Sequence, residues 1–202
     1  MTAQAPSLRK FVLHSFLWLP LCFAAWYFSA PYHGAVAGWF ARVWVDLFQP
    51  GIVSALEHQG IDLVFVTTIK VRSATGDPAV LLPEVNPLLY SYGLALFVAL
   101  MLAARAGFWK TLAGVAMLLP FQGWGIAFDF LAQVGIKLGP AVAAQAGVSG
   151  WRVEAIALGY QVGALILPSL VPVVMWAAFN RPFIEGALPS GTGTTRYRPS
   201  AR

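Results

Sequence analysis

The apolar stretch FVLHSFLWLPLCFAAWYFS, residues 11–29, decides the class of fold. It contains no acidic residue, lysine or arginine, and two basic residues stand directly before it. A helix of about 20 predominantly apolar residues crosses the hydrocarbon core of a bilayer. The basic start resembles a signal peptide, but the run is long and ends in three aromatic residues. We therefore predict a retained transmembrane helix over residues 11–29, after a cytoplasmic N-terminus at residues 1–10.

The amino-acid composition is typical of an integral membrane protein. Of the 202 residues, 58% are hydrophobic and 10% are charged, whereas a soluble domain carries about 25% charged residues because water must wet its surface. This imbalance excludes a soluble enzyme, a disordered chain and a nucleic-acid-binding module, so no nucleic-acid partner is expected despite the net charge of +5. The single cysteine, Cys22, can form no internal disulfide and is predicted to pack inside its helix.

Further apolar stretches at residues 86–104, 109–136 and 153–180 predict three more transmembrane helices. The fold class is accordingly an all-α polytopic membrane protein with four transmembrane helices, accompanied by an outer interfacial helix and a small β-hairpin. Neighbouring helices can satisfy the carbonyl groups that a proline frees, so we expect kinks rather than breaks at the prolines inside these spans. Pro120, Pro168 and Pro172 are among these prolines.

The charges orient this arrangement. Four spans place both termini and the turn at residues 105–110 on one side, and residues 30–85 and the loop at 137–152 on the other. The side of the termini carries eight basic residues and one acidic residue, and the opposite side carries five and seven, which gives net charges of +7 and −2. By the positive-inside rule both termini are predicted to be cytoplasmic, in a bacterial inner membrane with a periplasmic opposite side.

The basic excess near the termini predicts contact with anionic membrane lipid. The C-terminal tail at residues 181–202 is predicted to be cytoplasmic and, by its composition, disordered from about residue 189.

Residues 30–85 form the one large segment outside the spans. Apolar residues recur at helical spacing from His33 to Phe48, which predicts an interfacial helix anchored by Trp39 and Trp44. A short second helix is expected from Ile52 to His58. The β-branched run from Leu63 to Val71 predicts a strand, which a turn at residues 73–78 joins to a weaker return strand at residues 79–82.

Polar side chains inside the spans are the candidate functional residues, because an ionisable or amide group is costly there. Their spacing places Gln122, Asp129 and Gln133 on one helical stripe, and Glu154 and Gln161 on another. Two interpretations stay open: hydrogen bonding between helices, and a polar pocket or partner surface. The complete candidate set is Asn86, Tyr90, Tyr92, Gln122, Asp129, Gln133, Glu154 and Gln161.

No catalytic, cofactor or metal constellation is evident in the sequence. Cys22 lies eight residues from His14, about 12 Å along a helix axis, which is too far for a nucleophile and its base. Glu57 and His58 are adjacent, and no HExxH or paired-cysteine spacing occurs. We therefore expect the histidines to be structural and predict no cofactor. The glycines at positions 93, 107, 114, 123, 125 and 163 are expected to allow close helix packing.

The order of segments resembles the membrane core of the exosortase/archaeosortase family. The strand segment GIDLVFVTTIKV at residues 60–71 is followed by LLPEVNPLLYSYGLALFVALMLAA at residues 81–104, which enters a membrane helix. The resemblance spans roughly residues 50–180 and rests on layout. That family implies a catalytic Cys at the start of this helix, and an Arg and a His on later helices.

The chain departs from that family at each of these positions. It has Asn86-Pro87-Leu88-Leu89-Tyr90-Ser91-Tyr92-Gly93 at the helix entry, Gln122 and Asp129 in place of the Arg, and Gly159-Tyr160-Gln161 in place of the His. No catalytic role can be carried over. The chain is similar instead to the exosortase H-associated membrane proteins, which implies a non-catalytic partner.

The predicted function is a non-enzymatic accessory protein of a protein-sorting or surface-export system. Its expected partner is an exosortase-like membrane enzyme or the sorting segment of that enzyme's substrate, and self-association is left open. One alternative is a small carrier or channel subunit with a polar path through Gln122, Asp129, Gln161 and Tyr92. Another is a membrane enzyme that uses Asp129 or Glu154 as an acid or base, for which the sequence offers no nucleophile or metal partner.

Overall fold

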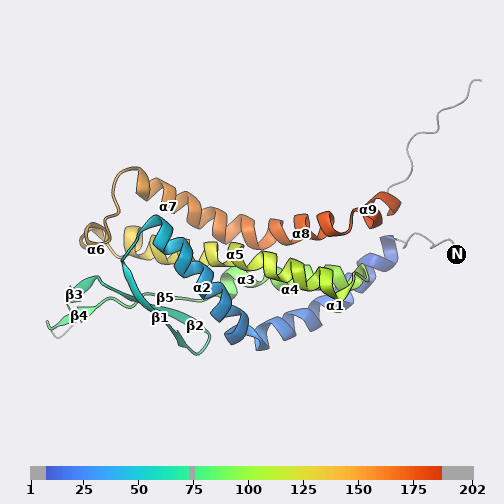
Figure 1. Ribbon diagram of the computed structural model, residues 1–202, viewed down its shortest axis with the longest axis horizontal. Helices are drawn as coiled ribbons and strands as arrows, with labels where there is room; N and C mark the ends of the chain where they lie inside the picture. Colours follow the sequence, from blue (N-terminus) through green and yellow to red (C-terminus); the bar gives the residue numbers. More distant parts are fainter. Residues whose placement is uncertain (1–7, 73–75, 188–202) are drawn as a thin grey trace, which may run out of the picture.

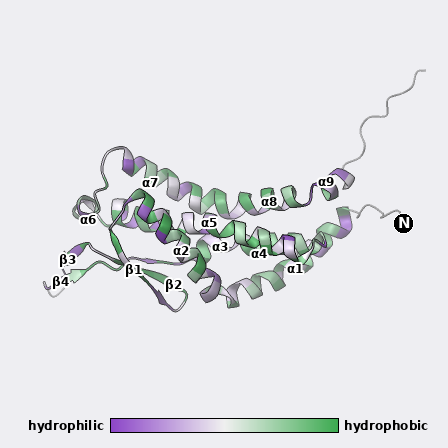
Figure 2. Cartoon of the chain, in the orientation of Figure 1, coloured by the Kyte–Doolittle hydropathy of each residue, from purple (hydrophilic) through white to green (hydrophobic). Residues whose placement is uncertain are grey.

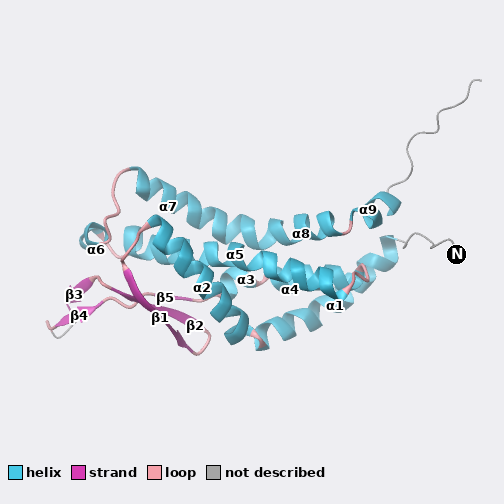
Figure 3. Cartoon of the chain, in the orientation of Figure 1, coloured by secondary structure: helices cyan, strands magenta, loops and turns pink. Residues whose placement is uncertain are grey.

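The computed structural model of the chain describes residues 8–72 and 76–187. Its helices form an elongated bundle, and its strands gather at one end (Figure 1, Figure 3). The start of the first helix and the whole of the last helix lie at the other end (Figure 1). We refer to these as the sheet end and the terminal end. The tail predicted to be disordered from about residue 189 lies outside the described residues.

Within residues 8–72 and 76–187, three helical segments are long and apolar enough to cross a membrane. Each coincides with a span predicted from hydropathy, and the helices continue through Pro120 and Pro172 without a break. Two of the segments contain a π-helical turn, and the turn in the last span directly precedes Leu167 and Pro168. The segments are α1 (Leu8–Phe28), α5 (Phe108–Ala132) with η1 (Gln133–Lys137), and α7 (Trp151–Gln161) with η2 (Val162–Ile166) and α8 (Leu167–Phe179).

The segment predicted as the second span is shorter, so the count of four transmembrane helices is not confirmed. It consists of α3 (Leu88–Ser91) and α4 (Gly93–Ala103), which are separated at Tyr92. At about 1.5 Å per residue, Leu88–Ala103 extends about 24 Å, less than the roughly 30 Å of a hydrocarbon core. The chain packs closely against α8 directly after this interruption. A Cβ atom on Gly93 would collide with the Pro168 carbonyl. The remaining short helices are α6 (Pro140–Gln145) and α9 (Arg181–Ala187).

The helix predicted from His33 to Phe48 is α2 (Ala30–Phe48). It begins three residues earlier than predicted because Pro31 fits the first turn of a helix, where no N–H is needed. Its small residues, among them Gly38 and Ala41, are buried, and the helix packs along α5. Its opposite face is exposed and apolar. We call this surface the α2 face; it consists of Tyr32, Val36, Trp39 and Val43.

The two predicted tryptophan anchors of α2 occupy different environments. Trp39 is 61% exposed on the α2 face. Trp44 is half-buried between helices: its Nε1 donates to the Pro120 carbonyl at 3.0 Å, and its ring contacts Trp124 edge-on at 4.9 Å. Trp44 therefore joins α2 to α5, and only Trp39 presents its ring to the surroundings.

The strands form two small antiparallel sheets, and the helix predicted from Ile52 to His58 is wrong. That segment is β1, which pairs with β2 from Val53↔Thr67 to Gln59↔Asp62. Gly60, with φ of +67°, allows the tight turn between them. The three-stranded sheet has the order β1-β2-β5, and β3 pairs with β4. The strands are β1 (Val53–Gln59), β2 (Asp62–Thr67), β3 (Lys70–Arg72), β4 (Pro78–Val80) and β5 (Glu84–Val85).

The predicted hairpin is present in altered form. The strand expected over Leu63–Val71 is divided into β2 and β3, and the expected return strand is β4, which pairs with β3 alone. The residues of β2 pair with β1 and β5, and Phe65 and Thr67 N–H also donate to the Pro83 and Leu81 carbonyls of the returning chain. The sequence pattern located the β-branched segment, but it did not predict β1, which the tight turn at Gly60 pairs with β2.

The core at the sheet end joins the three-stranded sheet to the bundle. Leu63 and Phe65 are fully buried on β2, and the Phe65 ring stacks on Phe130 of α5 with centroids 4.3 Å apart. Leu63 also lies against Gly38 of α2, where a larger residue would meet its side chain. The sheet is therefore fixed to the helices by buried aromatic and aliphatic contacts.

Hydrophilic residues concentrate toward the two ends of the structure, and apolar residues dominate between them (Figure 2). Most of the glycines expected to allow close packing do so. Gly114, for example, leaves no room for a Cβ beside Phe97. Gly107 is the exception: it precedes α5 in open space, so the prediction was wrong at this position.

Candidate functional site

A group of polar side chains meets inside the bundle around Asp129. We call it the Asp129 cluster; it consists of Tyr90, Asp129, Lys137 and Tyr160. Asp129 is 8% exposed, and its Oδ1 lies 3.0 Å from Lys137 Nζ. The same Nζ lies 4.5 Å from the centroid of the Tyr160 ring. The Tyr90 side chain interacts with both Asp129 and Tyr160.

The helix geometry explains how Lys137 reaches Asp129, eight residues earlier. Side chains on a helix tilt toward its N-terminus, so a long lysine extends back along the axis. Residues Gln133–Lys137 also form a π-helical turn, in which Leu138 N–H donates to the Gln133 carbonyl at 2.9 Å. Its i→i+5 bonding takes more residues per turn than an α-helix, which changes the direction of the last side chains. The π turn therefore accompanies a change in side-chain direction at the end of the helix, where Lys137 lies over Asp129.

Gly125 provides the space for Tyr90. A Cβ atom on Gly125 would collide with the Tyr90 ring, and Gly125 lies one helical turn before Asp129. Residues four apart share one face of a helix. The missing side chain therefore lets the Tyr90 ring pack directly against α5 near the carboxylate. Tyr90 is 4% exposed as a result.

The Asp129 cluster lies near the end of the apolar part of α5. Asp129 follows Phe108 by 21 residues, which is about 32 Å of helix at 1.5 Å per residue. A hydrocarbon core is about 30 Å thick. The side chain of Lys137 is 48% exposed whereas that of Asp129 is 11% exposed. The lysine therefore connects the buried carboxylate with the polar surroundings of the sheet end.

The other predicted site residues do not join this cluster. Asn86 Oδ1 accepts a hydrogen bond from Leu88 N–H at 2.9 Å, which closes a turn at the entry to α3. Gln133 donates to the Glu84 carbonyl at 2.9 Å, which ties η1 to β5. Tyr92 is half-buried at the break before α4. Glu154 and Gln161 share one helical stripe as predicted, and that stripe is exposed.

Gln122 is buried near Tyr90, and its Oε1 has no hydrogen-bond partner within the described residues. It borders a cavity of about 10 Å³ between α4, α5 and α8. A cavity needs roughly 10–15 Å³ to hold one water molecule. This space therefore has the size of a single water.

Sequence reasoning identified Tyr90 and Asp129 but missed Lys137 and Tyr160. Lys137 stands directly after the predicted span at residues 109–136, and an ideal α-helix does not direct residues eight apart at one point. Tyr160 stands next to the predicted Gln161, on the adjacent face of α7. A signal was present: the sequence has one acid deep in the third span and one lysine at its end.

A second polar contact joins the first three helices. Trp26 Nε1 donates to Ser91 Oγ at 3.1 Å, and His33 Nε2 lies 3.2 Å from the Trp26 carbonyl oxygen. The carbonyl can only accept, so this bond requires a proton on Nε2. His33 Nδ1 is buried without a partner in the described part of the chain. Burial lowers the pKa of His33, and the bond to Trp26 opposes that shift in part.

The remaining candidate catalytic residues do not come together. Cys22 is buried with Ala95 and Ala99 of α4. His14 Nδ1 lies 2.6 Å from the Lys10 carbonyl, which is a bond within its own helix turn. Glu57 and His58 are neighbours on β1, where successive side chains point to opposite faces. In residues 8–72 and 76–187, no three His, Cys, Asp or Glu side chains are placed to hold a metal ion.

The family comparison identifies the chain. The family model described as exosortase H-associated membrane protein matches residues 5–183. The chain belongs to this family. The match covers every helix and strand from α1 to α8, so the Asp129 cluster and the sheet lie within the matched region of this exosortase H-associated membrane protein. Searches of the curated proteins and of the solved structures gave no match.

Proposed function

We propose that this exosortase H-associated membrane protein is a non-catalytic accessory subunit that binds an exosortase-type enzyme in the bacterial inner membrane. The observation that carries the proposal is the family match over residues 5–183, whose name states an association with exosortase H. The protein would assist protein sorting or surface export by holding the enzyme, or the sorting segment of its substrate, at the sheet end.

The bonding of the Asp129 cluster supports a structural role. A general acid or base must be able to reach a substrate proton. Asp129 instead forms an ion pair with Lys137 and interacts with the Tyr90 side chain. Gln133 donates its hydrogen bond to the Glu84 carbonyl. The Lys137 contact lies within one helical segment, whereas Tyr90 joins α3 to α5 and the separate Gln133 bond joins η1 to β5. These contacts therefore hold the end of the α5–η1 helix against its neighbours.

The α2 face is the surface that we assign to the partner enzyme. Its four side chains are exposed, and the helix that carries them runs beside the sheet (Figure 1). Large exposed apolar surfaces next to polar ones mark interaction sites. Trp39 and Tyr32 are residue types that dominate interface energetics. A helix of a polytopic enzyme could pack on this face while the sheet contacts the enzyme's polar surface.

The charge distribution supports the proposed orientation. Arg105 lies in the turn between α4 and α5, Lys110 in the first turn of α5, and Arg181 at the start of α9. The start of α5 and α9 lie at the terminal end, away from the sheet (Figure 1). Positive residues are retained on the cytoplasmic side of a membrane. The proposal therefore places the terminal end in the cytoplasm and the sheet in the periplasm.

The carrier alternative receives less support. A polar path needs a continuous space, and the cavity beside Gln122 has room for about one water molecule. Gln161, one of the expected path residues, is exposed on α7 rather than turned toward Asp129. We therefore retain the accessory role as the proposed function.

Site-specific photocrosslinking in native membranes tests this function. A photoreactive amino acid replaces Trp39 on the α2 face, and a matched control replaces Leu165, which is 70% exposed on η2. We expect the Trp39 position to capture one polytopic enzyme and the Leu165 position to capture lipid. Recovery of only lipid or the protein itself from both positions would contradict the proposal.

A cleavage assay tests the non-catalytic part of the proposal. Purified protein in lipid is incubated with a peptide that carries a C-terminal sorting segment. We expect no cleavage unless an exosortase is added. Cleavage by the protein alone, abolished by Cys22→Ala, would show that the chain is an enzyme.

A further inference from the structure

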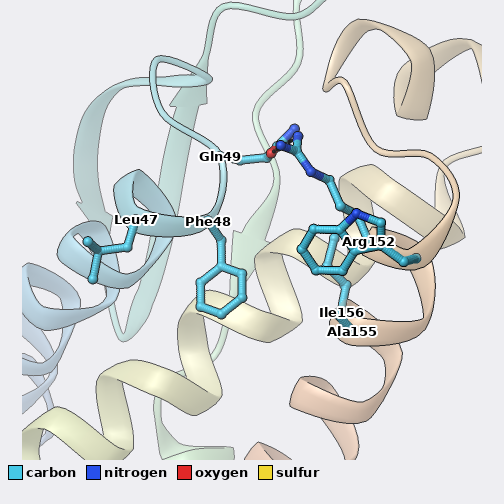
Figure 4. A pocket seen from close by; sticks show the side chains of 7 residues that line it. Leu47, Phe48, Gln49, Arg152, Ala155 and Ile156 are labelled. Carbon is cyan, nitrogen blue, oxygen red and sulfur yellow. Dashed lines mark hydrogen bonds between the residues drawn. The ribbon is translucent and has the colours of Figure 1, made fainter.

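A pocket of about 250 Å³ lies at the sheet end between the end of α2 and the start of α7 (Figure 4). It is separate from the Asp129 cluster and shares no residue with it. Leu47, Phe48 and Ile156 supply apolar walls, and Gln49 and Arg152 supply the polar groups. The pocket therefore combines one cation with a hydrocarbon lining.

The guanidinium of Arg152 is held by one of its edges. Its Nη1 donates to Gln49 Oε1 at 2.9 Å and lies 3.4 Å from the Gly147 carbonyl oxygen. Gln49 is itself buried and donates through Nε2 to the Ala146 carbonyl. Figure 4 shows the Gln49 side chain directed at the guanidinium. The loop before α7 thus positions the arginine through a buried amide.

The other edge of Arg152 is available. Within residues 8–72 and 76–187, no protein group accepts a hydrogen bond from Nε or Nη2, and no carboxylate pairs with this arginine. These two nitrogens form the fork that binds phosphate or carboxylate in a bidentate manner. An arginine held in position with this fork free is suited to an anion.

The depth of Arg152 matches the headgroup region of a bilayer. Its helix continues through η2 and α8 to Phe179, and the 29 residues of this segment extend about 43 Å at 1.5 Å per residue. A bilayer with its headgroups measures about 40–45 Å. If the terminal end of α8 lies at one surface, Arg152 lies among the headgroups at the other.

The surface next to the pocket is suited to an acyl chain. Trp151, which is 73% exposed, is followed by Ala155 and Leu158 at spacings of four and three residues. This spacing places the three side chains on one face of α7. Leu158 is also exposed. An apolar track therefore leads from Arg152 toward the middle of the bundle.

We propose that this pocket binds a phospholipid, with the phosphodiester on the free edge of Arg152 and an acyl chain along Trp151, Ala155 and Leu158. The site requires an anion and a hydrocarbon chain in the same molecule, which a membrane lipid supplies at this depth. The bound lipid would tie the end of α2 to the start of α7. This inference does not depend on the accessory function.

The experiment measures lipid retention by the full-length protein. The protein is purified into nanodiscs that contain phosphatidylglycerol, released in mild detergent, and analysed by native mass spectrometry. Arg152→Gln removes the cation, and Ala155→Leu fills the pocket without changing the charge. Arg42→Gln is the matched control, because Arg42 is paired with Asp46 at 2.7 Å. Thermal unfolding checks that each variant is folded.

We expect Arg152→Gln to weaken phosphatidylglycerol binding by about tenfold, which is the effect of losing one charge-assisted contact. Ala155→Leu should also reduce retention, Arg152→Lys should retain part of it, and Arg42→Gln should leave it unchanged. Equal retention by the wild type, Arg152→Gln and Ala155→Leu would overturn the proposal. Competition by glycerol phosphate or by a short peptide with a free carboxylate, at the strength of the lipid, would also overturn it, because the pocket would then recognise the anion alone.

Discussion

Lys137 lies two helical turns after Asp129, yet its Nζ is 3.0 Å from the Asp129 Oδ1. The π-helical turn that ends the long helix accompanies this contact. The pair joins a nearly buried carboxylate to a half-exposed ammonium. Its burial is therefore intermediate between that of a surface ion pair and that of a buried ion pair. Its energetic contribution is therefore expected to exceed that of a surface pair.

Removal of the lysine should destabilise the protein. We expect Lys137→Gln to lower the free energy of unfolding by about 1–2 kcal/mol, since surface pairs contribute up to about 1 kcal/mol and breaking a buried pair costs about 3–5 kcal/mol. Lys110→Gln, at the terminal end, is the control and should change it by less than about 0.5 kcal/mol. Unfolding in mixed micelles measures both. A double-mutant cycle with Asp129→Asn that shows no coupling would refute the pair's contribution.

The space at Gly125 should be essential for the position of Tyr90. We expect Gly125→Ala to destabilise the protein by about 1–3 kcal/mol, because the added methyl group collides with the Tyr90 ring and forces local repacking. Gly186→Ala is the matched control, since nothing lies within 4 Å of its Cβ position. It should be neutral or slightly stabilising. Equal effects of the two substitutions on the melting temperature would show that Gly125 is not a packing constraint.

Acidification should weaken the contact between the first three helices. The pKa of His33 is lowered by burial, so between the folded-state pKa and the ordinary value of about 6.5 the unfolded chain binds more protons. The free energy of unfolding therefore decreases as pH falls through this interval. Unfolding measured from pH 7.5 to pH 5 checks this expectation.

His33→Gln should flatten that pH dependence, because its amide can donate to the Trp26 carbonyl without titrating. The control is His58→Gln, on the exposed part of β1. A His33→Gln protein with the same pH dependence as the wild type would exclude His33 as its source.

The stacked rings of Phe65 and Phe130 should hold the sheet on the bundle. Phe65 is fully buried, so Phe65→Ala is expected to cost about 3–5 kcal/mol. Val80→Ala on β4, where the residue is 48% exposed, serves as the comparison and should cost less than about 1 kcal/mol. Hydrogen exchange of the β2 amides gives the local readout. Unchanged protection of β2 in Phe65→Ala would show that other contacts hold the sheet.

Hydropathy was sufficient to predict the long helices, because a continuous apolar run is a local property. The α1 and α5 segments and the segment from α7 to α8 follow it closely. The break at Tyr92 was not predicted, since it is associated with the contact between Gly93 and the distant Pro168. The β1 strand was mistaken for a helix for a related reason: its conformation is set by pairing with β2, and its own pattern is weak.

The site was predicted in part. Periodicity placed Asp129 among the polar residues of α5, and Tyr90 was recognised at the helix entry. Lys137 and Tyr160 were missed because the approach of Lys137 accompanies a π turn, which ideal helical spacing does not describe. Glu154 and Gln161 were predicted to share one stripe of their helix, and they do. Periodicity alone, however, does not determine whether such a stripe faces a neighbouring helix or the surroundings.

The stack of Phe65 on Phe130 also constrains how the protein is made. Phe130 is synthesised 65 residues after Phe65, which corresponds to roughly 3–13 s at about 5–20 residues per second. During this interval β1, β2 and β5 can pair and α2 is already present, but α5, which supplies the partner ring of Phe65, is not. The nascent chain therefore passes through a stage with an uncovered aromatic ring at the membrane surface, when the insertion machinery or the bilayer must shield it from aggregation.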